Sequence, residues 1–172
     1  MSTITIVIVT LLFSAFFSGI EIAFISSNRL KLELDKSSDS FISKTIAIFS
    51  RDESNFIASM LIGNNIALVI FSISMTKLLD PFLNEVISSS FLLLFTQTII
   101  STIVILITAE FIPKAIFRIN PNYMIKIFSL PLIFFYFLLY PIVFVMLAIS
   151  GFVLKYIFRL EINEVNQLFS KI

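Results

Sequence analysis

The sequence predicts an all-α membrane protein with three transmembrane helices, a cytoplasmic helical hairpin and a proline-kinked juxtamembrane helix. Hydrophobic residues make up 58% of the 172 residues and charged residues only 13%, which leaves too few polar groups to cover a surface in water. The apolar residues gather in long runs, and the basic residues gather between some of them. The chain is therefore expected in a lipid bilayer, and its net charge of +1 gives no reason to expect a nucleic-acid partner.

Three runs satisfy the length of about 20 mainly apolar residues that a spanning helix needs. They are Ile4 to Ile25, Phe56 to Met75 and Phe91 to Ile112. No Lys or Arg precedes the first run, and its apolar part is too long for the hydrophobic region of a signal peptide. We therefore expect it to be a retained span.

Basic residues predict the orientation, because Lys and Arg in short connections stay on the cytoplasmic side. The first connection contains Arg29, Lys31, Lys36, Lys44 and Arg51. The second contains only Lys77, beside Asp80 and Glu85. The N-terminus is thus expected outside, the first connection inside, and the C-terminus in the cytoplasm.

A fourth apolar run, Ile127 to Leu154, contains Pro131 and Pro141, each of which removes a backbone donor and tends to kink a helix. Basic residues flank it on both sides: Lys114, Arg118 and Lys126 before it, and Lys155, Arg159 and Lys171 after it. A simple crossing would leave one of these groups outside. We therefore expect this run to lie in or re-enter the inner leaflet with both ends cytoplasmic.

The first connection, Asn28 to Asn55, is expected to form a short amphipathic helix or hairpin on the cytoplasmic surface. "RLKLELD" alternates like a strand, but apolar residues from Phe41 to Phe49 recur at helical spacing. We expect residues 1–159 to be one membrane domain. The amphipathic segment 160–172 is expected to connect it to cytosolic domains that this chain does not include.

The absence of Cys and His restricts the chemistry that the chain can perform. It removes disulfides, thiolate and imidazole metal ligands, Cys and His nucleophiles and His-based proton relays. A membrane enzyme would have to use Glu21, Glu110 or the serines, so we expect no enzyme and no cofactor-binding residues. Any ion site must be built from oxygen atoms.

Polar residues in the first span form a stripe, since Ser14, Ser18 and Glu21 follow helical spacing and Gly19 beside them allows another helix to approach. The stripe has two interpretations. The hydroxyls can bond to carbonyls four residues earlier at a packing interface. Alternatively, an acid inside a span indicates a functional site.

The second span contains "LIGNNIAL", in which adjacent amides point about 100° apart on a helix. Asn64 and Asn65 therefore cannot both face one site. Either one of them is a ligand, or both make hydrogen bonds between helices.

Near the end of the third span, Glu110 follows a run from Phe91 to Ala109 that contains no charge, and Pro113 comes three residues later. Pro113 cannot donate to the carbonyl of Ala109, which leaves that oxygen unpaired beside the Glu110 side chain. The alternative is a helix-end ion pair between Glu110 and Lys114. With the serines and the amide, these groups make an all-oxygen set that suits a hard cation such as Mg²⁺, Ca²⁺ or Na⁺.

Three motifs carry a family resemblance: "FFSGIEIAFISSNRLKLE" (16–33), "LIGNNIAL" (61–68) and "AEFIPKAIF" (109–117). They resemble the transmembrane domain of the CorC/CorB and CNNM (cyclin-M) family of Mg²⁺ transporters. The resemblance implies a homodimer in a bacterial inner (plasma) membrane, with three spans per subunit, a juxtamembrane helix and associated cytosolic CBS domains. It also implies Mg²⁺ efflux, with Na⁺ as the expected coupling ion.

The resemblance matches Ser18 and Gly19 to functional positions of the family's first motif, Asn64 to the second, and Glu110 with Pro113 to the third. Ser14, Glu21 and the Ala109 carbonyl complete the expected metal-site residues, and Gly19 and Pro113 are expected to act structurally. The leading alternative is a membrane anchor or assembly subunit in which the polar stripe only holds helices together.

Overall fold

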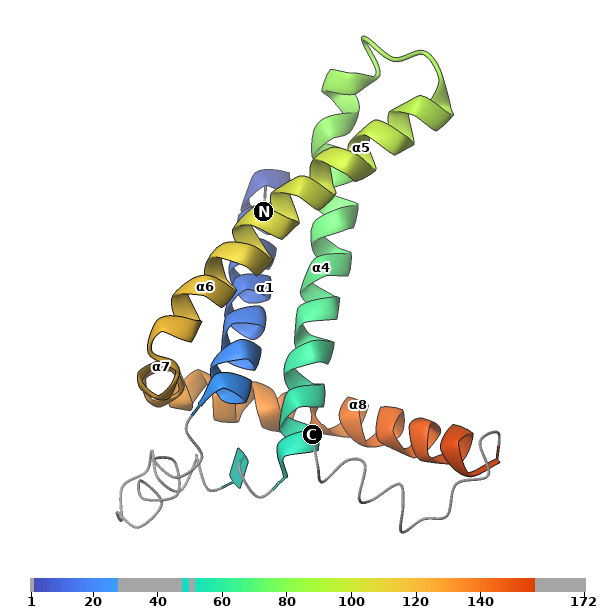
Figure 1. Ribbon diagram of the computed structural model, residues 1–172. Helices are drawn as coiled ribbons and strands as arrows, with labels where there is room; N and C mark the ends of the chain where they lie inside the picture. The colour runs from blue at the N-terminus through green and yellow to red at the C-terminus, as the bar shows by residue number, and fades with distance from the viewer. Residues whose placement is uncertain (1, 28–47, 50–51, 157–172) are drawn as a thin grey trace. The chain divides into compact units, whose positions relative to one another are not determined.

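A computed structural model describes residues 2–27, 48–49 and 52–156 of the protein. The hairpin expected in the first connection lies largely outside these residues, and the expected amphipathic segment 160–172 lies wholly outside them. Each secondary-structure element in the described residues is a helix (Figure 1). The all-helical part of the predicted fold class is therefore confirmed.

The chain divides into two compact units, and the division falls inside a single helix, α4 (Glu53–Leu83). One unit contains Met1–Ser26 and Gly63–Pro121, and the other contains Ser27–Ile62 and Asn122–Ile172. The residues expected to bind a cation all belong to the first unit.

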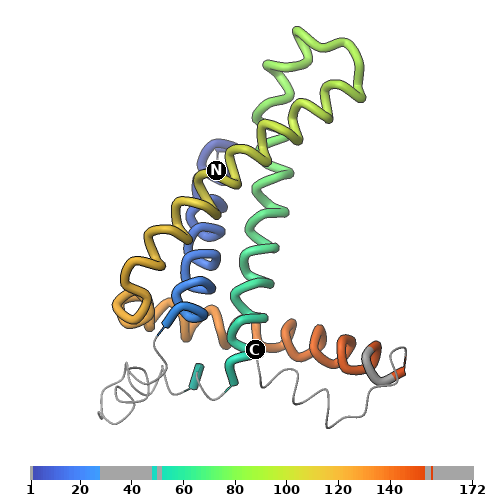
Figure 2. Tube along the Cα trace, in the orientation of Figure 1, coloured from blue at the N-terminus to red at the C-terminus, as the bar shows by residue number. Residues whose placement is uncertain are grey.

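The first unit consists of α1 (Thr3–Ser26), residues 63–83 of α4, α5 (Ser90–Ile105), the π-helix η1 (Leu106–Phe111) and α6 (Ile112–Ile119). Figure 2 shows α5, η1 and α6 following one another as a continuous helical path. Helix α1 packs against η1 and α6. A buried apolar cluster of Val7, Phe71 and Met75 joins α1 to α4, and side chains of α5 pack against it.

Two glycines in the first unit accommodate aromatic rings. A Cβ atom added at Gly19 of α1 would lie 2.7 Å from Cδ2 of Phe117 on α6. A Cβ atom added at Gly63 of α4 would lie 2.7 Å from Cε1 of Phe17 on α1. Both glycines therefore permit close packing of α1, the first against α6 and the second against α4.

We expect Gly19→Ala to destabilise the protein by about 1–3 kcal/mol, because the added methyl group would displace the Phe117 ring. Gly151→Ala is the matched control, since a Cβ atom there meets no other atom within 4 Å. Thermal unfolding of the purified protein compares the two variants. Equal stability of the two variants would contradict the packing assigned to Gly19.

The second unit consists of residues 53–62 of α4, α7 (Pro121–Ile127) and α8 (Ser129–Tyr156), with Phe49 packed among them. The fully buried rings of Phe49 and Phe56 have centroids 4.5 Å apart, and the ring of Tyr136 on α8 lies 5.7 Å from Phe49. This aromatic cluster connects α8 to the first turns of α4.

The prolines of the fourth apolar run occupy different positions in α8. Pro131 lies in the first turn, where an N–H has no partner within its own helix, and Leu132 N–H bonds to Phe128 O at 2.9 Å. A kink at Pro131, one of the two prolines at which a kink was predicted, is therefore not supported, because proline is tolerated in the first turn of a helix. Pro141 lies inside α8, and a kink there stays a prediction.

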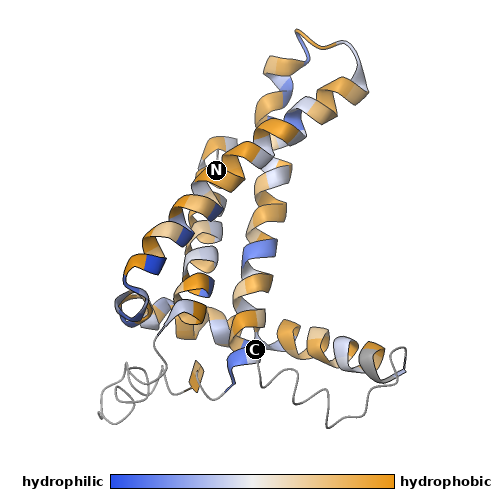
Figure 3. Cartoon of the chain, in the orientation of Figure 1, coloured by the Kyte–Doolittle hydropathy of each residue, from blue (hydrophilic) through white to orange (hydrophobic). Residues whose placement is uncertain are grey.

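Four helical segments are long and apolar enough to cross a membrane: Thr3–Ser26, Glu53–Leu83, Ser90–Ile119 and Ser129–Val153. The first three contain the predicted spans, and hydrophobic residues predominate along all four (Figure 3). The chain is thus a multi-pass membrane protein. Length and composition also admit a crossing by α8, so the number of three spans stays a prediction.

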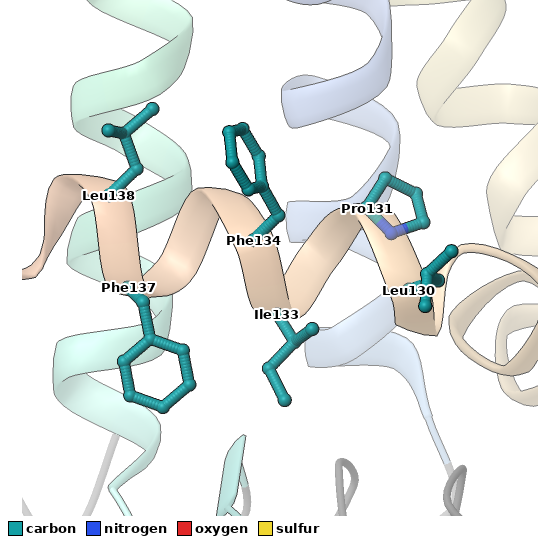
Figure 4. A pocket seen from close by; sticks show the side chains of 6 residues that line it. All are labelled: Leu130, Pro131, Ile133, Phe134, Phe137 and Leu138. Carbon is teal, nitrogen blue, oxygen red and sulfur yellow. The ribbon is translucent and has the colours of Figure 1, made fainter.

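A groove of about 860 Å³ on α8 is open and apolar. Figure 4 shows its lining, which consists of Leu130, Pro131, Ile133, Phe134, Phe137 and Leu138. None of these side chains carries an oxygen atom, so the groove offers no ligand to a hard cation.

Candidate cation site

A direct hydrogen bond joins the first two motifs. Ser14 is fully buried on α1, and its Oγ donates to Oδ1 of Asn64 on α4 at 2.6 Å. Asn64 is 8% exposed, whereas Asn65 lies on the exposed face, as helical geometry requires. Ser14 was expected as a metal ligand, but this bond gives it a second function, because it orients the Asn64 oxygen.

Ser18 lies one turn after Ser14 on α1 and is also fully buried. Its Oγ has no hydrogen-bond partner among the described residues. Thr10 and Ser59, by contrast, donate to carbonyls four residues earlier, at 2.8 and 2.7 Å. Ser14 donates to Asn64 and not to a carbonyl of its own helix, so it joins two helices, as a packing serine can, but without the expected backbone bond.

We expect Ser18→Ala to weaken Mg²⁺ binding by roughly tenfold, since one neutral oxygen ligand is lost. The ion-free protein should become more stable by up to about 1–3 kcal/mol, because an unpaired buried hydroxyl is removed. Calorimetric titration measures the affinity, and thermal unfolding without divalent ions measures the stability. A variant with unchanged affinity would contradict a ligand role for Ser18.

The third motif begins in the π-helix η1, which the sequence did not predict, and continues into α6. At the end of η1, Ile112 N–H bonds to Ile107 O, five residues earlier. Continuing this register would pair residue 113 with the Thr108 carbonyl, and an α-helical register would pair it with the Ala109 carbonyl. Pro113 is buried and has no N–H, so neither carbonyl receives a bond from it. Ala109 itself is fully buried.

Glu110 makes the ion pair that was the alternative interpretation of this motif. Its Oε2 lies 3.8 Å from Nζ of Lys114, and the two side chains are 30% and 41% exposed. The separation is long for an ion pair, and neither side chain is buried within the chain. Glu21 on α1 interacts electrostatically with both residues. The two carboxylates expected near the site therefore belong to one charge network with Lys114.

The predicted site residues are thus brought together in two groups. Ser14 and Asn64 are hydrogen-bonded, and Glu21, Glu110 and Lys114 interact through charge. Helix α1 contributes to both groups and packs against η1, which contains Ala109. Ser18 makes no hydrogen bond to either group. Within the described ranges, no three Asp, Glu, His or Cys side chains form a metal cluster, so a cation would depend on neutral oxygens as well as carboxylates.

Comparison with known protein families supports the motif-based prediction. A family model described as the cyclin M transmembrane N-terminal domain matches residues 5–171. A search of curated proteins found no significant match. The match covers all three motifs and the helices that carry the polar residues. The chain therefore belongs to the cyclin M transmembrane N-terminal domain family.

Proposed function

We propose that this chain transports Mg²⁺ out of the cell, coupled to Na⁺, through an all-oxygen site within the membrane. Its family is associated with Mg²⁺ transport and is a transporter-type membrane domain, not a family of enzymes. The observation that carries the proposal is Ser18. Its unpaired hydroxyl is buried on α1, which packs against the π-helix that contains Ala109 and Glu110.

In this proposal, Ser18, Asn64, Glu110 and the Ala109 carbonyl bind Mg²⁺, and Ser14 contributes by orienting Asn64. Glu110 supplies the negative charge that a divalent ion needs in a medium of low dielectric constant. Glu21 contributes charge nearby or binds the counter-ion. Lys114 competes with Mg²⁺ for Glu110, because it already lies 3.8 Å from that carboxylate.

The proposed assembly is a homodimer, because a single three-span subunit can hardly enclose the polar residues of its spans. The Glu110 side chain, for example, is 30% exposed within one subunit. Cross-linking in lipid should trap a dimer. A monomer that binds Mg²⁺ as well as the dimer would refute the need for one.

We expect a topology in which α8 does not cross the membrane and the C-terminus is cytoplasmic. A Lys171→Cys variant should then be labelled by a membrane-impermeant maleimide only after the membrane is opened, because the native chain has no Cys of its own. The same substitution at Ser2, expected outside, is the control. Labelling of residue 171 in intact cells would overturn the topology.

Mg²⁺ flux into or out of proteoliposomes that contain the purified chain tests the proposed function. We expect flux that depends on the Na⁺ gradient and is lost in Glu110→Gln. Flux that is equal in empty vesicles and in vesicles with protein would contradict transport by this chain.

The second candidate function is a membrane anchor or assembly subunit. It is favoured by the contacts of Gly19 with Phe117 and of Ser14 with Asn64, which hold helices together without any ion. Under this alternative, Asn64→Ala would lower stability and leave Mg²⁺ binding absent in both the variant and the parent protein.

A further inference from the structure

A second polar group lies in the first unit near the connection between α4 and α5. Gln97 of α5 is 2% exposed, and its Nε2 donates a 3.2 Å hydrogen bond to Oδ1 of Asp80 on α4. The other end of the same amide, Oε1, is buried and has no hydrogen-bond partner in the part of the chain that the structure describes. Burying an amide oxygen without a hydrogen-bond donor costs free energy. This oxygen is therefore available to coordinate a ligand.

Other oxygen atoms occur on the same two helices. Ser101 follows Gln97 by one turn on α5 and is 8% exposed, so both side chains share the buried face of that helix. On α4, Pro81 lies inside the helix and cannot donate to the carbonyl of Lys77. Carboxylate, amide, hydroxyl and carbonyl oxygens are the atoms that hard cations select.

An apolar layer separates this group from the first site. Along α4, Phe71 and Met75 come after Asn64 and before Asp80, and both belong to the buried cluster with Val7 of α1. Phe71 is fully buried. An ion bound beside Asp80 would therefore occupy a different place from an ion bound beside Asn64.

We propose that Asp80 and Gln97 form a binding site for a monovalent hard cation such as Na⁺. One carboxylate balances a single positive charge, whereas a divalent ion would leave excess positive charge close to Lys77, three residues before Asp80. In the structure the amide donates to the carboxylate. On binding, the amide turns so that Oε1 faces the ion together with the Asp80 oxygen, and the unpaired atom gains its ligand.

The test measures thermal unfolding of the full chain in NaCl and in N-methyl-D-glucamine chloride at equal ionic strength. Wild type should be stabilised specifically by NaCl. Gln97→Met preserves the length of the side chain and Asp80→Asn alters an exposed residue, so both variants should fold. Each variant should need at least tenfold more NaCl than wild type for the same stabilisation. Thr98→Val is the matched control, because the exposed Thr98 hydroxyl bonds to Leu94 O of its own helix at 2.8 Å.

The outcomes separate this site from the Mg²⁺ site. Loss of the Na⁺ effect in Asp80→Asn, with Mg²⁺ binding retained, supports the inference. An unchanged Na⁺ effect in Gln97→Met or Asp80→Asn would overturn it, and so would a wild type that does not respond to Na⁺. Loss of the Na⁺ effect only in Glu110→Gln would also overturn it, because Na⁺ would then bind at the first site.

Discussion

Glu110→Gln is expected to lower Mg²⁺ affinity on the order of a hundredfold or more, while the helices remain folded. The substitution keeps the size of the side chain but removes the charge that would hold a divalent ion, and removing even an indirect partner of a metal typically costs about 10–100-fold in affinity. Thermal unfolding with and without Mg²⁺ provides the measurement. A ligand at a hundred times its Kd raises the free energy of unfolding by about 2.7 kcal/mol, and the variant should lose this increase.

Lys114→Met is the matched control, because it breaks the 3.8 Å ion pair from the other side. If Glu110 is a metal ligand, this variant should bind Mg²⁺ at least as tightly as the parent, since a competing cation has been removed. If Glu110 serves only as half of the ion pair, the two variants should have the same effect. Similar behaviour of Glu110→Gln and Lys114→Met would therefore refute the ligand role.

Pro113→Ala is expected to weaken Mg²⁺ binding by roughly tenfold or more without removing any ligand side chain. The new N–H can bond to the carbonyl of Ala109 in an α-helical register or to that of Thr108 in the π register. Only the α-helical bond uses the Ala109 carbonyl that the proposed site requires, so weaker Mg²⁺ binding is the result expected for that register. The ion-free protein should at the same time become more stable, because the new N–H adds a backbone hydrogen bond that proline cannot make.

Pro141→Ala separates the two effects, since Pro141 also lies inside a helix, α8, but in the second unit. It should raise stability without changing Mg²⁺ affinity. The affinity is measured by titration, and stability by unfolding in the absence of divalent ions. Unchanged Mg²⁺ binding in Pro113→Ala would leave Glu110 with the simpler role of a partner for Lys114.

The helices could be predicted from sequence because apolar runs of spanning length have few alternatives to a helix in lipid. The ends of the helices were less predictable. The second span was expected to end at Met75, but α4 continues to Leu83, because its backbone hydrogen bonds do not require apolar side chains. Likewise, the third helical segment continues past Ile112 to Ile119. The position of Pro131 in the first turn of α8 depends on where that helix begins, which hydropathy alone does not reveal.

The candidate site was predictable as a set of residues but not as a set of contacts. Helical spacing placed Ser14 and Ser18 on one face and separated Asn64 from Asn65, since these relations lie within single helices. The hydrogen bond from Ser14 to Asn64 depends on how two helices pack. The π-helix η1 differs from an α-helix by one residue in its hydrogen-bond register, and six residues are too few for a distinct periodicity. Pro113 indicated a defect at this point without specifying its form.

Calorimetric titration of the purified chain in lipid with MgCl₂, and separately with CaCl₂ and NaCl, tests most directly whether these oxygens form a cation site. We expect saturable Mg²⁺ binding by the parent protein that is weakened by Ser18→Ala and abolished by Glu110→Gln. The absence of saturable Mg²⁺ binding by folded parent protein, or equal binding by parent and Glu110→Gln, would contradict the proposed site.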